Sequence, residues 1–236
     1  MTYQFNYSSQ TNDDFIKGYT ELTQERINDG WSGYFCSFMF KPINPNRKAA
    51  IELMKDAISK FYSTLLTRLI RDPNGPSSVG RLPVLISVAD LPRPGANAPL
   101  ADTTINGGLH FHGILLIPAK NRLQLPLMDY VGQNLTTYLP VDGIIKRIHM
   151  KSIEDTPDQV VDYAFKSIKK FKFNYDDGVL VLPRASSECR KESTLECGAV
   201  QVRGPDMAHK GKREHQGAAS IIMHLSSDAV TIPFAA

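Results

Sequence analysis

The first third of the chain changes from an aromatic-rich run to a helical repeat of apolar positions. Residues 33–40 (GYFCSFMF) are rich in aromatic side chains, which are typical of a strand. Beyond them, apolar residues return every three or four positions, which predicts one buried helical stripe. We expect Asn44 to cap this helix with Pro45 at its first position, and residues 72–76 (DPNGP) to end it. The stripe consists of Ile51, Met54, Ile58, Phe61, Leu65 and Leu69.

Shorter apolar runs follow, and they predict further strands. The second and third strands most simply form an antiparallel pair joined by the long Pro- and Gly-rich loop of residues 92–108. Residues 119–142 are expected to form a short helix and a loop. The strands after the first are expected at residues 82–89, 109–117, 143–153 and 179–182, and a weak helical pattern covers residues 15–27.

A second clear helical signal begins at residue 156. Thr156 is expected to be the N-cap, Pro157 the first helical residue and Gln159 the third, as in a capping box. The helix is expected to reach about Phe173, because the lysines near its end suit the negative end of the helix dipole.

The order of these elements predicts an α+β fold of the ferredoxin-like or split βαβ kind. We expect a mainly antiparallel sheet of about five strands flanked by helices. The chain divides into a polar, helical N-terminal extension (1–32), a central domain (33–183) and a basic, partly flexible tail (184–236).

Composition narrows the class of protein only slightly. The chain has 236 residues, of which 42% are hydrophobic, and a formal net charge of +3, so binding of polyanions would depend on local patches. Three cysteines without tight spacing indicate neither a disulfide framework nor a zinc site. No signal peptide or membrane-spanning run is visible, so a cytoplasmic protein without membrane contact is expected.

Two histidines one residue apart give the first candidate chemistry. His110 and His112 lie in the apolar run 109–117, and strand alternation places both imidazoles on one face. Two imidazoles and a carboxylate can hold a divalent metal ion, with Mg²⁺ or Mn²⁺ expected here. Asp90, at the end of the preceding strand, is the favoured third ligand, and Asp102 in the long loop is the alternative.

A tyrosine and a lysine on the late helix give the second candidate site. Tyr163 and Lys166 are one turn apart and can therefore reach the same phosphate. A tyrosine phenol, with an ordinary pKa of about 10, is a poor nucleophile unless a nearby cation stabilises the phenolate. Lys166 and a bound metal are the candidate cations, and Tyr175 is the alternative nucleophile.

Together these motifs resemble the HUH endonuclease superfamily, in particular its single-tyrosine rolling-circle replication initiators. The aromatic run of residues 34–40, His110-Phe111-His112 and the sequence DYAFK at residues 162–166 stand in that family's order. Asp90 occupies the place of an acidic third ligand. No second tyrosine lies one turn after Tyr163, which is why the single-tyrosine type is expected.

The resemblance implies nicking and joining of single-stranded DNA through a 5′-phosphotyrosine intermediate. The implied partner is a single strand or a DNA hairpin at a replication origin, with the host helicase and polymerase as further partners. A catalytically inactive nucleic-acid-binding regulator, a single-strand transposase and a metal-dependent hydrolase that uses water are the alternatives. Basic residues expected to contact the DNA backbone are Lys146, Arg147, Lys151, Lys169, Lys170 and Lys172.

Overall fold

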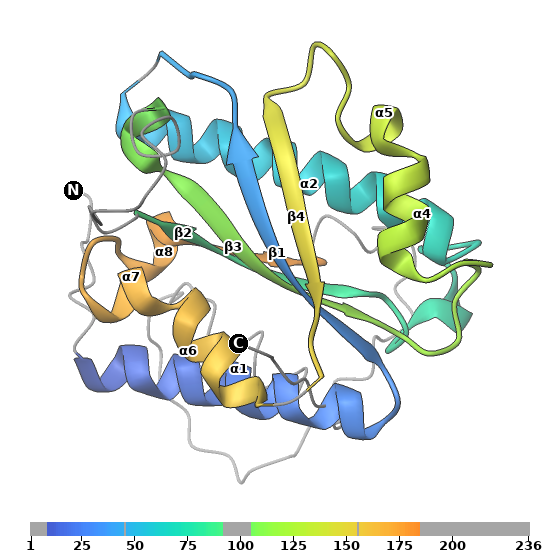
Figure 1. The fold of residues 1–236 in the computed structure, drawn as a ribbon. Helices are drawn as coiled ribbons and strands as arrows, with labels where there is room; N and C mark the ends of the chain where they lie inside the picture. Colours follow the sequence, from blue (N-terminus) through green and yellow to red (C-terminus); the bar gives the residue numbers. More distant parts are fainter. Residues whose placement is uncertain (1–8, 45, 92–104, 155, 185–236) are drawn as a thin grey trace, which may run out of the picture.

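A five-stranded antiparallel sheet with helices on both faces forms the molecule. The computed structural model describes residues 9–44, 46–91, 105–154 and 156–184 (Figure 1). The strand order in the sheet is β4-β1-β3-β2-β5, and each neighbouring pair is antiparallel. The strands are β1 (Ser32–Phe40), β2 (Val84–Asp90), β3 (His110–Ile117), β4 (Ile145–Ser152) and β5 (Val179–Leu182).

The connections are those of two interlocked split βαβ units. Strand β3 lies between β1 and β2 and is antiparallel to both, so β1 and β2 run in the same direction. The crossover between them is helix α2 (Arg47–Leu69). Likewise β3 and β4 flank β1 and are linked through α4 (Leu127–Gln133) and α5 (Leu135–Tyr138). The predicted fold class is therefore confirmed.

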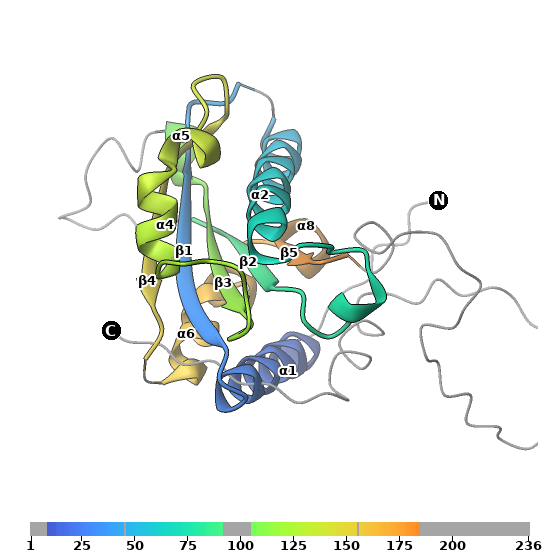
Figure 2. The same cartoon turned by 90° about the vertical axis from the view of Figure 1, so that its right-hand side faces the viewer.

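The two faces of the sheet are covered by different helices. Helix α2 crosses behind β1 and β4, while α1 (Ser9–Asn28) and α6 (Pro157–Ala164) lie side by side (Figures 1 and 2). On the α2 face, Phe38 packs edge-on against Phe61. On the other face, Tyr163 of α6 packs against Phe35. The remaining short helices are η1 (Pro76–Ser78), η2 (Ile105–Gly108), α7 (Lys166–Lys169) and α8 (Tyr175–Gly178).

One predicted helix start is wrong, and the other is confirmed in position but lacks its expected capping. The N-cap of α2 is Asn46, not Asn44, because the Asn46 side chain accepts a hydrogen bond from the Ala49 amide at 3.0 Å. Pro45 lies outside the described residues. Thr156 does precede α6, but its backbone is left-handed and its side chain makes no capping hydrogen bond. The expected capping box therefore does not form.

The prediction of one long late helix is also wrong. Instead of reaching residue 173, α6 ends at Ala164, and α7 and α8 follow as separate short helices. Phe165 lies at the break with backbone angles outside the helical range (φ −87°, ψ 4°) and is completely buried. Tyr163 and Lys166 consequently stand on either side of a break, not on one continuous helix.

Several expectations fall on residues that the structure does not describe. Asp102, most of the 92–108 loop and nearly all of the tail from residue 184 lie outside the described residues. The proposed domain boundaries stay predictions, although α1 packs into the core through Tyr19 and Leu22. Among the described helices, none is both long enough and apolar enough to cross a lipid bilayer.

Candidate metal centre

The register of the two central strands brings three metal-ligating side chains together. In the β2–β3 pair, Asp90 lies directly opposite His110, and Val88 lies opposite His112. Because opposite residues of an antiparallel pair share a face, the carboxylate and both imidazoles lie on the α6 side. The Nε2 atoms of the two histidines are 3.2 Å apart, and each is 3.3 Å from the Oδ2 atom of Asp90.

This nearly equilateral triangle has the dimensions of a metal site. Protein ligands lie about 2.0–2.3 Å from a Zn²⁺, Mg²⁺ or similar ion, so neighbouring ligand atoms are about 2.8–3.8 Å apart in octahedral or tetrahedral geometry. The three side chains are almost wholly buried, with 0% of Asp90, 5% of His112 and 12% of His110 exposed. Asp90, His110 and His112 thus form a group that could hold a metal ion.

The outer ring nitrogens of both histidines already have partners. The Nδ1 atom of His110 lies 2.8 Å from the carbonyl oxygen of Gly108. A carbonyl only accepts, so the proton of neutral His110 resides on Nδ1 and leaves the Nε2 lone pair for a metal. The Nδ1 atom of His112 lies 3.2 Å from the Ser37 hydroxyl oxygen, which suits the same tautomer.

A short left-handed segment aims the Gly108 carbonyl at His110. Asn106, Gly107 and Gly108 have φ angles of 55°, 64° and 79°, a region that glycine and asparagine tolerate best. The Asn106 side chain fixes this segment to the end of β1, because its amide donates to the Lys41 carbonyl and its oxygen accepts from the Ile43 amide. The turn before β3 is therefore part of the construction of the site.

A buried serine orients the Asp90 carboxylate. The Ser167 hydroxyl donates to Oδ1 of Asp90 at 2.5 Å, which leaves Oδ2 facing the histidines. Burial alone would raise the pKa of the Asp90 carboxyl, but its contacts with His110, His112, Ser167 and Lys166 outweigh burial and hold the pKa well below its ordinary value. Asp90 is therefore an anion at neutral pH.

Burial keeps His112 neutral. Desolvation lowers the pKa of His112 to about 4, against the raising effect of the Asp90 carboxylate. A neutral imidazole with a free Nε2 lone pair is the form that binds metal ions. The protonation states of the carboxylate and of this histidine are thus those of metal ligands.

The ammonium group of Lys166 also lies in the centre. Its Nζ atom is 2.9 Å from Asp90 Oδ2 and 3.5 Å from His112 Nε2. It also lies 3.8 Å from the centre of the Tyr163 ring. Among the described residues, the ion pair with Lys166 is the shortest contact of the buried Asp90 carboxylate oxygen Oδ2.

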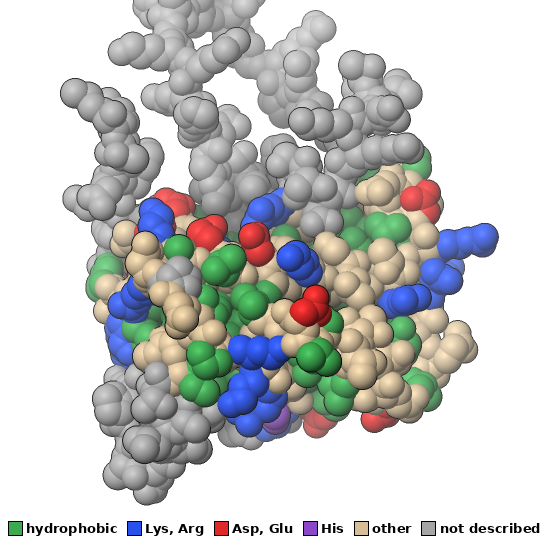
Figure 3. All heavy atoms as spheres, turned by 90° about the horizontal axis from the view of Figure 1, so that it is seen from above, with side chains coloured by type: hydrophobic (Ala, Val, Ile, Leu, Met, Phe, Trp, Pro, Cys, Tyr) green, Lys and Arg blue, Asp and Glu red, His purple; other side chains and the backbone are tan. Residues whose placement is uncertain are grey.

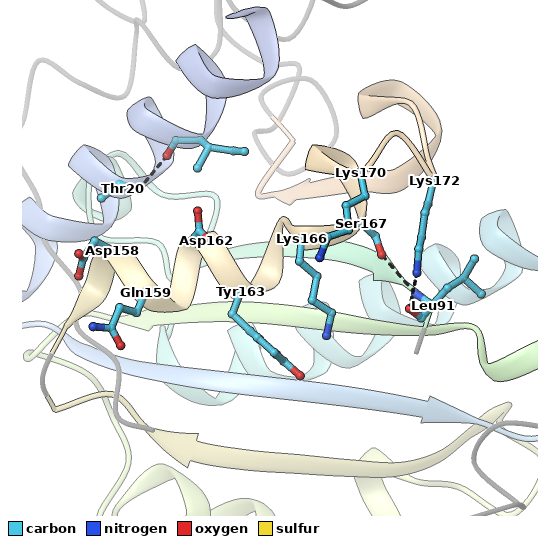
Figure 4. Close-up of a pocket in the computed structure, with 11 residues that line it drawn as sticks. Thr20, Leu91, Asp158, Gln159, Asp162, Tyr163, Lys166, Ser167, Lys170 and Lys172 are labelled. Atoms are coloured by element: carbon cyan, nitrogen blue, oxygen red, sulfur yellow. Dashed lines mark hydrogen bonds between the residues drawn. The ribbon is translucent and has the colours of Figure 1, made fainter. Parts of the chain in front are cut away.

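Tyr163 stands at the edge of the centre. Its ring centre is 5.0 Å from that of His112 and 5.8 Å from that of Phe35. Tyr163 and Lys166 both extend from their helices toward the sheet, whereas Asp162 points the other way (Figure 4). Tyr163 is 44% exposed and lines an open cleft of about 800 Å³. A ligand can therefore reach the tyrosine from solvent.

The basic residues predicted to bind DNA are not equivalent in the structure. Arg147 and Lys151 lie opposite Met39 and Phe35, which places them on the histidine face of the edge strand β4. Lys169 instead pairs with Asp162, which neutralises its charge. Lys170 and Lys172 line the cleft beside Tyr163, and Lys146 is exposed at the bulge near the start of β4.

Surface charge is mixed where the molecule is seen from above. On that face Lys and Arg side chains stand among acidic and apolar ones and form no single basic surface (Figure 3). Any polyanion contact there would be local.

Sequence reasoning missed three parts of the site. Ser37 is a lone polar residue inside an otherwise aromatic and apolar run, and this contrast was an available signal. Ser167 directly follows Lys166 and has no distinguishing pattern. The Gly108 carbonyl is a backbone group, which side-chain patterns cannot reveal.

Comparison with known proteins does not identify a family for this chain. A scan against protein-family models, a search of curated proteins and a search of solved structures each gave no match. The structure therefore supports an α+β protein with a buried His-x-His/Asp cluster that could hold a metal ion.

Proposed function

We propose that the protein is a metal-dependent nuclease of the HUH type that cuts single-stranded DNA with Tyr163 as the nucleophile. The observation that carries this proposal is the short distance between the tyrosine and the ligand cluster, 5.0 Å between the rings of Tyr163 and His112. A phosphate lying over His112 would touch both the candidate metal centre and the phenol. The resemblance of the three sequence motifs supports the same reading.

Asp90, His110 and His112 would hold the metal ion, and two imidazoles suit Mn²⁺ better than Mg²⁺, which prefers oxygen ligands. When bound, the ion would supply positive charge that polarises the scissile phosphodiester. The chain contributes the orientation of the ligands, because Ser167, Ser37 and the Gly108 carbonyl each fix one of them.

The chemical step is a transesterification. The phenol oxygen of Tyr163 forms a bond to phosphorus and gives up its proton to solvent, while the bond from phosphorus to the 3′ oxygen breaks and that oxygen takes up a proton. The products are a 5′-phosphotyrosine and a free 3′-hydroxyl. The reverse reaction rejoins strands, because the covalent link keeps the energy of the broken bond.

Tyr163 is better placed for this step than Tyr175. The Tyr175 side chain is buried, and its hydroxyl pairs with that of Tyr19, so it has no access to a phosphate. Tyr163 is exposed and adjoins Lys166. Lys166 would orient the phenol or stabilise charge on the phosphate.

The biological setting belongs to the same proposal. Initiation of rolling-circle replication would require a single strand or a hairpin at an origin, with host helicase and polymerase to follow. Transposition would use the same chemistry on the ends of an element.

The decisive experiment incubates the protein with labelled single-stranded oligonucleotides and Mn²⁺, followed by denaturing electrophoresis. We expect a slow-migrating protein–DNA adduct that Tyr163→Phe abolishes and EDTA prevents. Tyr130→Phe is the matched control, because Tyr130 packs against Tyr138 away from the centre. An adduct that persists in Tyr163→Phe would contradict the proposal. Cleavage without an adduct would favour a water-using hydrolase, and binding without cleavage a regulator.

A further inference from the structure

The position of Lys166 conflicts with that of a bound metal ion. Its ammonium contacts the same oxygen, Oδ2 of Asp90, that completes the triangle of metal ligands, at 2.9 Å. It also lies 3.5 Å from the Nε2 atom of His112, another corner of that triangle. A divalent ion bound at this triangle would face a positive charge only a few ångströms away.

We propose that Lys166 is an internal counter-ion that competes with the metal for Asp90, and that metal binding displaces its ammonium group toward Tyr163. The inference rests on the metal centre of the proposed function but not on the cutting of DNA. It assigns Lys166 a role in setting metal affinity that precedes any role on a phosphate.

Electrostatics gives the first reason for competition. Buried charges need a partner, and Asp90 is fully buried and anionic, so Lys166 stabilises it when no metal is bound. A divalent ion satisfies the same carboxylate with twice the charge. Two cations at this separation repel each other strongly in a partly desolvated site, so one replaces the other.

The position of Lys166 gives the second reason. Its side chain is 25% exposed, unlike that of Asp90, so it has a route out of the centre. It begins α7 directly after the break at Phe165, and its four-carbon stem allows the ammonium to move while the backbone stays in place. The Tyr163 ring lies only 3.8 Å from the ammonium, on the exposed side chain that borders the cleft.

Metal binding would therefore rearrange the nucleophile's surroundings. The ammonium that neutralises Asp90 in the absence of metal becomes available to the phenol or to a phosphate once the metal has taken its place. Metal loading and preparation of Tyr163 are then one coupled event.

The test measures Mn²⁺ affinity of the full chain by electron paramagnetic resonance of the free ion. Lys166→Met keeps the length of the side chain but removes its charge, and we expect it to bind Mn²⁺ at least about tenfold more tightly than the wild type. Lys55→Met is the matched control, because Lys55 is also a largely buried lysine paired with a carboxylate, that of Glu52, and its affinity should not change. Asp90→Asn should abolish binding. Unchanged or weaker binding by Lys166→Met would overturn the inference.

A second measurement uses the wild-type protein and does not depend on the folding of a variant. Lysines are acetylated with and without Mn²⁺, and labelling is quantified by mass spectrometry. Labelling of Lys166 should rise when Mn²⁺ is added, whereas labelling of the exposed Lys17 should stay constant. If Lys166 labelling stays the same or falls, competition is wrong. If the wild type binds no Mn²⁺, the metal centre and the proposed function both fail, whereas failure of the two lysine tests alone leaves the proposed function standing.

Discussion

The two faces of strand β3 serve different purposes although their residues alternate along one segment. Phe111 points into the α2 face, where it is completely buried and packs edge-on against Phe40. Its neighbours His110 and His112 point to the α6 face and meet Asp90 there. Gly113 belongs to the α2 face again, and a Cβ atom there would come within 3.1 Å of Phe38 and Leu85.

The α2 face of β3 contributes to stability, whereas the α6 face carries the groups of the candidate metal centre. Burial of an aromatic ring on the α2 face contributes about 1.5–3 kcal/mol to folding, and the close fit adds more. The carboxylate and imidazoles on the α6 face cost free energy to desolvate. These three groups could instead hold a metal ion. Variants of neighbouring residues should therefore lose different properties.

Removal of both histidines should have the largest effect, and it should act mainly on metal binding. His110→Ala combined with His112→Ala should weaken Mn²⁺ binding at least about a thousandfold, because even outer partners of metal ligands contribute about 10–100-fold. The free energy of unfolding should change by no more than about 2 kcal/mol. Titration calorimetry and urea unfolding measure both. His149→Ala is the control, because His149 is an exposed residue on the same face of the sheet. An equal loss of Mn²⁺ affinity in His149→Ala would show that His110 and His112 are not specific ligands.

Truncation of Phe111, which lies between the two histidines, should lower stability and leave metal affinity nearly unchanged. Phe111→Ala should lower the free energy of unfolding by about 3–5 kcal/mol, because it leaves a cavity in a fully packed layer. Mn²⁺ affinity measured below the unfolding transition should change by less than about threefold. A large change in affinity without a loss of stability would show that the two faces are not separate.

Loss of a supporting hydroxyl should give an intermediate effect. Ser37→Ala removes the partner of His112 Nδ1, so we expect about tenfold weaker Mn²⁺ binding. The free energy of unfolding should fall by about 1 kcal/mol, which is the usual contribution of one hydrogen bond. Ser59→Ala, which removes a hydroxyl bonded to a helix carbonyl on α2, controls for the loss of a hydroxyl elsewhere. Unaltered affinity in Ser37→Ala would mean that Ser37 does not orient the histidine.

The edge strand should show the smallest effect. Arg147→Ala combined with Lys151→Ala should lower the slope of log affinity against log salt for single-stranded DNA by about 1.4, because each phosphate contact contributes about 0.7. Fluorescence anisotropy at several salt concentrations measures the slope. Lys60→Ala combined with Lys120→Ala removes two exposed charges elsewhere and should leave the slope unchanged. Identical slopes in both double variants would exclude β4 as a specific contact.

Hydrophobic pattern was sufficient to predict the sheet but not the ends of its helices. All five strands lie where alternating or apolar runs predict them, because the burial of side chains decides strand position. The cap of α2 moved from Asn44 to Asn46 because only the latter reaches the third helical amide. The break at Phe165 has no periodic signal, since the apolar residues continue on both sides of it.

The site was predictable to the extent that strand register is predictable. Alternation places the two histidines together, and the β2–β3 pairing then places Asp90 opposite His110. The contact of Lys166 with Asp90 depends on the break between α6 and α7 and on how α7 packs on β2, which are tertiary properties. Such a contact lies beyond what residue spacing can indicate.

Anomalous diffraction from a crystal of the full chain soaked in Mn²⁺ tests the central claim most directly. We expect one strong manganese peak about 2.0–2.3 Å from Oδ2 of Asp90 and from Nε2 of His110 and His112, with the Tyr163 hydroxyl facing it. A peak at other residues, or no peak while Asp90 and the histidines stay as placed here, would contradict the metal centre and with it the proposed chemistry.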